Sequence, residues 1–372
     1  MADTFADLPD ALVRDLLACA SGLAEGVRVS LGNLRDSRAS YRQAAAEHQL
    51  IKKRADLDVP REPSVCGIDG SYQLHRLTSM DLCAAAAVAV EGTSKEATRY
   101  WPEPYHRMWA ASLVHNTDTT GALRALMVSM EMDLAAEAPH DLVLLDGAFA
   151  SLIIYLNQGL AKFEEVPQPL ATELRTSWVE KGILNRLLAL LSSDRVVAVP
   201  KFTSRNELVA TGKLPSASGV DGRTLATVIL EPGEYTVPLP IYQNDEPYHL
   251  PRAVCTKDEE ATLNGTLREV QAVYFRPFGW SPALRLEVPG SIANSLTRLS
   301  ILFEGITRQL FSPAVLEPYP LFLADRMVKS LGAGVAVIEQ TVMQHVADAG
   351  GDVELTMLCL QNYRTEGGRG GV

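Results

Sequence analysis

Two stretches of the sequence decide its fold: Ser64-Val-Cys-Gly-Ile-Asp-Gly-Ser71 and Asp141-Leu-Val-Leu-Leu-Asp-Gly147. Each is a short, mostly apolar run that delivers an aspartate directly before a glycine. Apolar runs of this length are typical of strands buried in the centre of a sheet. A single Asp-Gly pair is a common turn. Two pairs on successive core strands predict that Asp69 and Asp146 share a crevice at one edge of a sheet, each at the end of its strand.

The segments around these stretches alternate between strand and helix patterns. Further strands are predicted at 82–90, 98–101 and 195–200, and amphipathic helices at 119–137 and 170–193. The resulting order is strand, strand, strand, helix, strand, helix, strand. This order predicts an α/β fold with an RNase H-like mixed sheet flanked by helices, in which an antiparallel start joins parallel strands through helical crossovers. The spacing alone also fits several other α/β folds.

The pattern divides the chain into three parts. Residues 1–60 are predicted to form a helical N-terminal extension, and residues 61–362 the α/β domain, which ends in a helical C-terminal region. Within that domain, a proline- and glycine-rich region at about 208–290 is predicted to form inserted loops and hairpins. The glycine-rich residues 363–372 are predicted to be a disordered tail.

Composition excludes several classes of protein. The 372 residues are 47% hydrophobic, yet no apolar run reaches the roughly 18 residues that a membrane helix needs. The acidic start lacks the order of a secretory signal. We therefore expect a soluble, cytoplasmic protein. Five scattered cysteines without a CxxC pair and seven scattered histidines indicate neither a disulfide framework nor a zinc site.

The charge balance limits how the protein can bind nucleic acid. A net charge of −11 argues against autonomous, high-affinity DNA binding, because neutralisation of phosphates supplies most non-specific affinity. Nucleic acid would have to be held by local basic patches, such as Lys52-Lys53-Arg54, or delivered by a partner. The sequence contains no Gly-x-x-x-x-Gly-Lys-Ser/Thr run, so we do not expect the protein to hydrolyse ATP itself.

The paired aspartates indicate metal chemistry. Two close carboxylates repel each other unless one is protonated or a cation lies between them. Manganese or magnesium accepts carboxylate ligands and completes its shell with water and phosphate oxygens, which is the two-metal chemistry of phosphodiester hydrolysis. Asp69 and Asp146 therefore favour phosphoryl transfer over acyl transfer.

Other charged residues are candidates for the same crevice. Glu131 lies at the margin of the apolar stripe of helix 119–137, although an ordinary solvent-facing glutamate is an equal alternative, and Asp133 and Glu137 compete for the role. Lys201 follows a buried strand and is a candidate to hold a phosphate. The same loop carries additional hydrogen-bond donors: Ser204, Arg205 and Asn206. The alternative is that this loop is simply solvated and binds nothing.

These motifs together resemble the NurA nucleases over about residues 65–329. The resemblance rests on Ile68-Asp-Gly-Ser71, on Glu131 ahead of Leu144-Leu-Asp-Gly147, on Val199-Pro-Lys201 and on Tyr319-Pro-Leu-Phe-Leu-Ala-Asp325. The combination is much more specific than any single motif. It implies an RNase H-like fold and a manganese- or magnesium-dependent nuclease that acts on DNA ends and single strands. It also implies a homodimer that works with a HerA-type hexameric ATPase, in DNA end processing or in defence against phage.

The resemblance also assigns roles to residues. It implies that Asp69, Glu131, Asp146 and Lys201 are catalytic. It further implies that two metal ions are held by Asp69, Glu131, Asp146 and Asp325. The last motif of the family commonly ends in histidine, whereas this sequence has Asp325 there. An aspartate is also able to bind a metal.

Two alternatives remain at this point. Asp325 has a plain alternative role in a salt bridge to Arg326 or Lys329. For the protein as a whole, the alternative is a non-catalytic adaptor that regulates a motor ATPase, although the retained acids count against it. A phosphotransferase such as a sugar kinase is remote, because the glycine-rich phosphate loops are missing.

Overall fold

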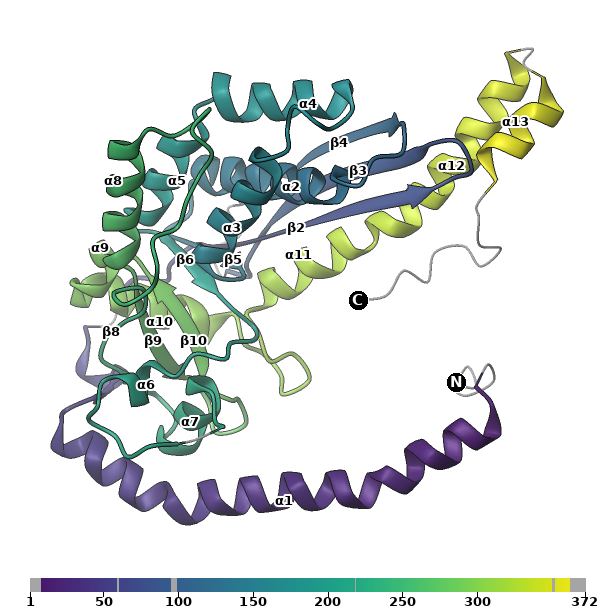
Figure 1. Cartoon of the computed structure of the whole chain (residues 1–372). Coiled ribbons are helices and arrows are strands. Elements are labelled where there is room, and N and C mark those ends of the chain that lie inside the picture. The colour runs from purple at the N-terminus through teal and green to yellow at the C-terminus, as the bar shows by residue number, and fades with distance from the viewer. Residues whose placement is uncertain (1–7, 59, 95–98, 218, 350–351, 362–372) are drawn as a thin grey trace.

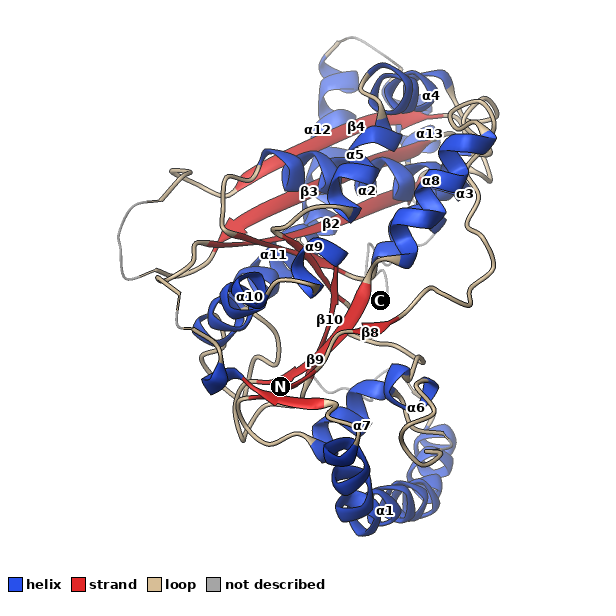
Figure 2. Cartoon of the chain, turned by 90° about the vertical axis from the view of Figure 1, so that its left-hand side faces the viewer, coloured by secondary structure: helices blue, strands red, loops and turns tan. Residues whose placement is uncertain are grey.

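The computed structural model describes residues 8–58, 60–94, 99–217, 219–349 and 352–361 (Figure 1). Within these residues, ten strands form one mixed sheet in the order β1-β7-β9-β10-β6-β5-β2-β3-β4, with β8 paired to β9. The strands are β1 (Ile51–Lys53), β2 (Val65–Arg76), β3 (Asp81–Glu91), β4 (Tyr105–Leu113), β5 (Leu142–Asp146), β6 (Val196–Val199), β7 (Glu234–Thr236), β8 (Leu239–Pro240), β9 (Gln271–Arg276) and β10 (Leu284–Val288). Figure 2 shows a marked change of strand direction between β4 and β9, as the twist of a large sheet requires.

The centre of the sheet is parallel and its flanks are antiparallel. Strand β5 pairs in parallel with β2 on one side and with β6 on the other. Strands β3 and β4 continue from β2 in antiparallel order, and β10, β9 and β7 continue from β6 in the same way. This arrangement confirms the predicted mixed sheet, in which an antiparallel start joins parallel strands.

Helices cover both faces of the sheet (Figure 1). The helices are α1 (Asp10–Glu47), α2 (Thr119–Glu137), α3 (Phe149–Leu160), α4 (Gln168–Arg175), α5 (Ile183–Leu191), α6 (Glu207–Ala210), α7 (Gly222–Ile229), α8 (Lys257–Arg268), α9 (Gly290–Ala293), α10 (Leu296–Arg308), α11 (Tyr319–Lys329), α12 (Leu331–Asp348) and α13 (Val353–Leu360). The predicted helix 119–137 is confirmed with the same bounds.

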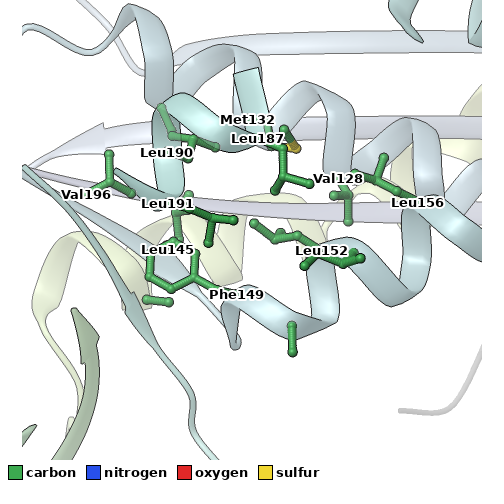
Figure 3. Packing of buried hydrophobic residues seen from close by; sticks show 14 of the residues in the cluster. Val128, Met132, Leu145, Phe149, Leu152, Leu156, Leu187, Leu190, Leu191 and Val196 are labelled. Carbon is green, nitrogen blue, oxygen red and sulfur yellow. The ribbon is translucent and has the colours of Figure 1, made fainter. Parts of the chain in front are cut away.

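Burial on both faces explains why β5 is apolar from Leu142 to Leu145. Val143 and Leu145 belong to the core that α2, α3 and α5 form on one face, whereas Leu142 and Leu144 belong to the core that α10 and α11 form on the other. Figure 3 shows the first of these cores, where Leu145 lies beside Phe149 and Leu191. A strand that is buried on both faces cannot show polar alternation.

Two predicted elements are wrong in position. The predicted helix 170–193 is broken into α4, a π-helical turn (Thr176–Glu180) and α5, because Gly182 adopts a left-handed φ of +66°. The third strand is β4 and not 98–101, of which Thr98 lies outside the described residues. β4 is an edge strand with alternating exposure, so its polar residues concealed it from a search for apolar runs.

The N-terminal region is helical, as predicted, but the helix ends before residue 60. Helix α1 ends at Glu47, and Gln49 has a φ of 52°, which turns the chain into β1. The basic triplet therefore lies on and just after a strand that pairs with β7, and Arg54 forms an ion pair with Glu304. The predicted disordered tail 363–372 lies outside the described residues. No helix in the described part of the chain has the length and apolar character to cross a membrane.

Candidate active site

Asp69 and Asp146 meet where the pairing of β2 with β5 stops. Asp146 is the last residue of β5, as predicted. Asp69 is not at the end of its strand, because β2 continues to Arg76. It instead follows Ile68, which forms the last parallel pair with Leu145. The predicted edge of the sheet is therefore the end of β5, beside a longer β2.

The alternation of the strands directs these aspartates toward α11. Gly67, two residues before Asp69, packs so closely on this helix that a Cβ atom there would lie 2.5 Å from the backbone nitrogen of Leu321. This contact brings Asp325, which α11 carries, to the same place. Oxygen atoms of Asp69, Asp146 and Asp325 all lie within 4.8 Å of one another. The structure thus brings together three of the four predicted metal ligands.

Lys201 neutralises part of this cluster. Its Nζ lies 3.0 Å from Oδ2 of Asp146, 3.1 Å from Oδ1 of Asp325 and 3.2 Å from Oε2 of Glu317. Burial alone would lower the pKa of Lys201, but the surrounding carboxylates outweigh it and raise the pKa. Lys201 therefore keeps its positive charge in the middle of the acids.

The other donors of this loop are used elsewhere. Arg205 pairs with Asp245 at 2.5 Å, and the side chain of Asn206 caps α6 by accepting a hydrogen bond from the Val209 nitrogen. The structure gives neither of them a contact with the acids. Among the charged residues of this loop, Lys201 is the one that contacts them.

Glu131 approaches from α2, outside the three-acid cluster. It is only 6% exposed, and its carboxylate lies so close to the Gly70 backbone that any side chain at Gly70 would clash with it. Burial, followed by repulsion from Asp69 and Asp146, raises the pKa of Glu131 well above its usual range. The competing acids are occupied, because Asp133 pairs with Arg186 and Glu137 pairs with Arg107.

Asp69 and Asp325 have pKa values that shift in opposite directions. Burial, and then the charge of Asp146, raises the pKa of Asp69 from 3.8 to about 8. Burial also acts on Asp325, but hydrogen bonds from Lys329 and Lys201 outweigh it and lower its pKa. The Lys329 contact is 2.9 Å, so the salt bridge considered from the sequence exists alongside the clustering with the other acids.

Glu317 is a site residue that the sequence analysis missed. It stands in the loop before α11 and contacts Lys201, and burial raises its pKa while Lys201 opposes the shift. No strand or helix pattern surrounds it. Its closeness to the Tyr319 motif in the sequence was the one available signal.

A buried ion-pair network supports the turn after Asp146. In this network, the Arg285 network, the guanidinium group of Arg285 contacts the carboxylates of Glu207 and Glu287, each at 2.6 Å. Glu287 also accepts a hydrogen bond of 2.9 Å from the backbone nitrogen of Phe149, the first residue of α3. The network therefore anchors the segment that connects Asp146 to α3.

The acids open into a cleft of about 380 Å³. Asp69, Glu131, Asp146 and Lys201 line it, together with apolar side chains of α2 and α3. Carboxylate oxygens are the ligands that hard divalent cations prefer. A cluster of three such oxygens, with further acids at its margin, therefore has the chemistry to hold a divalent metal ion, and no softer ligand of the zinc type takes part in it.

Comparison with known proteins identifies the family. Residues 63–330 match the NurA domain, whereas none of the curated proteins matches the sequence. The fold is similar to a crystal structure of the NurA nuclease from Sulfolobus solfataricus, with a TM-score of 0.57, 12% identity and coverage of 91% of this chain and 98% of the other.

Two other crystal structures are similar in fold at 13% identity. A structure of NurA has a TM-score of 0.52 and coverage of 91% of this chain and 99% of the other. A structure of NurA with manganese has a TM-score of 0.51, with coverage of 89% and 98%. Since the matched domain takes up most of the chain, and the fold around the acids agrees with it, the chain belongs to the NurA domain family.

Proposed function

We propose that this protein is a metal-dependent nuclease that hydrolyses phosphodiester bonds in DNA. The observation that carries the proposal is the cluster of Asp69, Asp146 and Asp325 oxygens within 4.8 Å, of which Asp69 and Asp146 line an open cleft. Membership of the NurA domain family and the similar fold of a manganese-containing NurA structure support it. Manganese or magnesium is the proposed cofactor.

The residues divide the work by position. Asp69, Asp146 and Asp325 are proposed to hold the metal, and Glu131, on the α2 side of β2, to complete a site for two ions. Bound ions would supply the Lewis acidity for attack of water on the phosphorus and would stabilise the leaving oxygen. Lys201 is proposed to bind an oxygen of the scissile phosphate, since its ammonium group already lies among the oxygens that the metal would take.

The proposed partners are a second copy of the chain and a HerA-type hexameric ATPase. The family resemblance suggests both. The net charge of −11 and the lack of a Walker-type motif in the sequence support a separate motor that brings DNA to the nuclease. DNA end processing and defence against phage are the proposed settings. Co-purification of the two tagged proteins, followed by size-exclusion chromatography with light scattering, tests this part.

The nuclease proposal is tested by incubating purified protein with end-labelled single- and double-stranded DNA of one sequence. We expect cleavage with manganese and none with EDTA. Asp146→Ala is expected to abolish cleavage while its circular dichroism spectrum stays that of the wild type. The matched control is Glu137→Ala on α2, an exposed acid that pairs with Arg107 and should leave cleavage intact.

Two results would contradict the proposal. Wild-type cleavage by Asp146→Ala would remove the acids from the reaction. The second result is a wild-type protein that cleaves neither single- nor double-stranded DNA with manganese or magnesium, whether alone or with the ATPase. If that protein nevertheless changes the rate of ATP hydrolysis by the ATPase, the non-catalytic adaptor is favoured instead.

A further inference from the structure

An exposed aromatic side chain stands at the mouth of the cleft. Phe202 follows Lys201 directly and lines the same cleft as Asp69 and Asp146, yet it is 93% exposed. No other large apolar residue in the described part of the chain approaches this exposure. Single exposed apolar residues are normal on protein surfaces. This one is distinguished by its place in the lining of the cleft, beside Lys201.

A second feature lies on α2, the helix that also carries Glu131. Arg124 precedes Glu131 by seven residues, so the two share one face of α2 about two turns, or roughly 10 Å, apart. The guanidinium carbon of Arg124 lies 5.0 Å from the ring centre of Tyr155 and 5.6 Å from that of Tyr72. Its Nη2 also donates a hydrogen bond of 2.9 Å to the hydroxyl group of Tyr72.

Arg124 is held in place but not neutralised. Among the described residues it has no carboxylate within ion-pair distance, and its contacts are with the aromatic rings. Tyr155, which holds it, lines the cleft. A guanidinium group that is fixed by stacking keeps its donor fork for an anion, and phosphate fits that fork in a bidentate manner.

We propose that the cleft binds an unpaired nucleic-acid strand with one base stacked on Phe202 and with a phosphate further along the strand bound by Arg124. The proposal rests on the proposed nuclease function, because it places the scissile phosphate at the acids, between these two anchors. An acidic protein needs such local anchors, since its net charge repels the strand. Stacking requires a base that is free of its partner, and it tolerates every base because each has a flat face. Phe202 therefore favours unpaired strands without sequence preference.

The first experiment measures the base contact. Cleavage of a labelled single strand is compared with cleavage of the same strand carrying abasic tetrahydrofuran sites. Phe202→Ala is expected to raise KM for the normal strand roughly tenfold and to leave cleavage of the abasic strand unchanged. Phe202→Trp should restore the wild-type KM. In a binding assay with calcium in place of manganese, the fluorescence of a 2-aminopurine base in the strand should be quenched on binding to the wild type. It should not be quenched on binding to Phe202→Ala.

The second experiment measures the phosphate contact. Arg124→Ala is expected to raise KM for normal and abasic strands alike and to weaken the salt dependence of binding. The matched control is Arg175→Ala on α4, whose guanidinium carbon lies 5.5 Å from the Phe163 ring centre. Phe163, unlike the Tyr155 ring that holds Arg124, does not line the cleft. This control should match the wild type in every assay.

The outcomes separate the two proposals. A wild-type protein that cleaves no strand contradicts the proposed function itself. If the wild type cleaves DNA and Phe202→Ala has the wild-type KM and quenching, stacking on Phe202 is refuted while the nuclease stands. If Phe202→Ala weakens only the binding of the ATPase, Phe202 is a contact for a protein and the inference is likewise overturned.

Discussion

Replacing Asp69 with asparagine should stabilise the metal-free protein and abolish its response to metal. Asp69 is 8% exposed, and burial, followed by repulsion from Asp146, raises its pKa from 3.8 to about 8. The folded state therefore holds a proton that the unfolded state releases. The contribution of Asp69 to stability is therefore greatest below pH 3.8, falls as the pH rises toward 8 and then levels off, because at this residue the folded state binds more protons than the unfolded state across this range.

The size of the effect follows from the pKa shift. At pH 7.5, the difference from 3.8 is 3.7 units, and each unit corresponds to about 1.4 kcal/mol, so the cost of Asp69 reaches roughly 5 kcal/mol. Unfolding entropy is about 2.1 cal/mol/K per residue, or about 0.8 kcal/mol/K for 372 residues. Asp69→Asn is neutral and similar in shape, so we expect its Tm in EDTA to exceed that of the wild type by roughly 2–6 °C.

The assay is thermal unfolding followed by circular dichroism between pH 5 and 9, in EDTA and in manganese. The Tm difference between Asp69→Asn and the wild type should grow as the pH rises to about 8. Manganese should raise the Tm of the wild type but not that of Asp69→Asn. Asp133→Asn is the matched control. It removes an acid that pairs with Arg186, so it should lower the Tm and leave the manganese response intact. A metal-free Asp69→Asn protein that melts below the wild type, or that responds equally to manganese, would refute the reasoning.

Two further substitutions probe the support of the site. Gly70→Ala places a Cβ atom against the Glu131 carboxylate, so we expect a loss of about 1–3 kcal/mol in urea unfolding together with reduced cleavage. Gly279→Ala, whose Cβ would meet its nearest atom at 3.6 Å, should change neither. Arg285→Met leaves the buried glutamates of the Arg285 network without a cation and should cost about 3–5 kcal/mol, whereas Arg298→Met breaks an exposed pair and should cost less than about 1 kcal/mol. Equal losses in either pair of variants would contradict these assignments.

The local sequence pattern was sufficient to predict elements whose burial leaves a clear apolar signal. The apolar run 142–145 is buried on both faces, so its sequence shows a central strand and places Asp146 at its end. Helix 119–137 was predicted to the residue, because its apolar stripe and its length leave little choice. The edge strand β4 was missed, since exposed and part-buried residues alternate along it, and polar residues such as His106, Arg107 and Ser112 interrupt any apolar run.

The assembly of the site was only partly visible in the sequence. Asp69, Asp146 and Lys201 could be chosen because each is tied to a core strand. Whether Glu131 or Asp133 faces the cleft depended on a difference of two helical positions, which the pairing of Asp133 with Arg186 decides. Glu317 had no pattern at all, because a loop residue is placed by the elements on either side of it.

The sequence by itself determined which strands are central, and therefore that two aspartates lie at the edge of a sheet. Only the tertiary structure decided that Asp69 lies within a longer strand, and that Asp325 and Glu317 join Lys201 beside it. The physical reason is distance along the chain. The contact of Lys201 with Asp325 spans 124 positions and exists because α11 packs against Gly67. Hydrophobic periodicity reports which face of an element is buried, but not which distant element covers it.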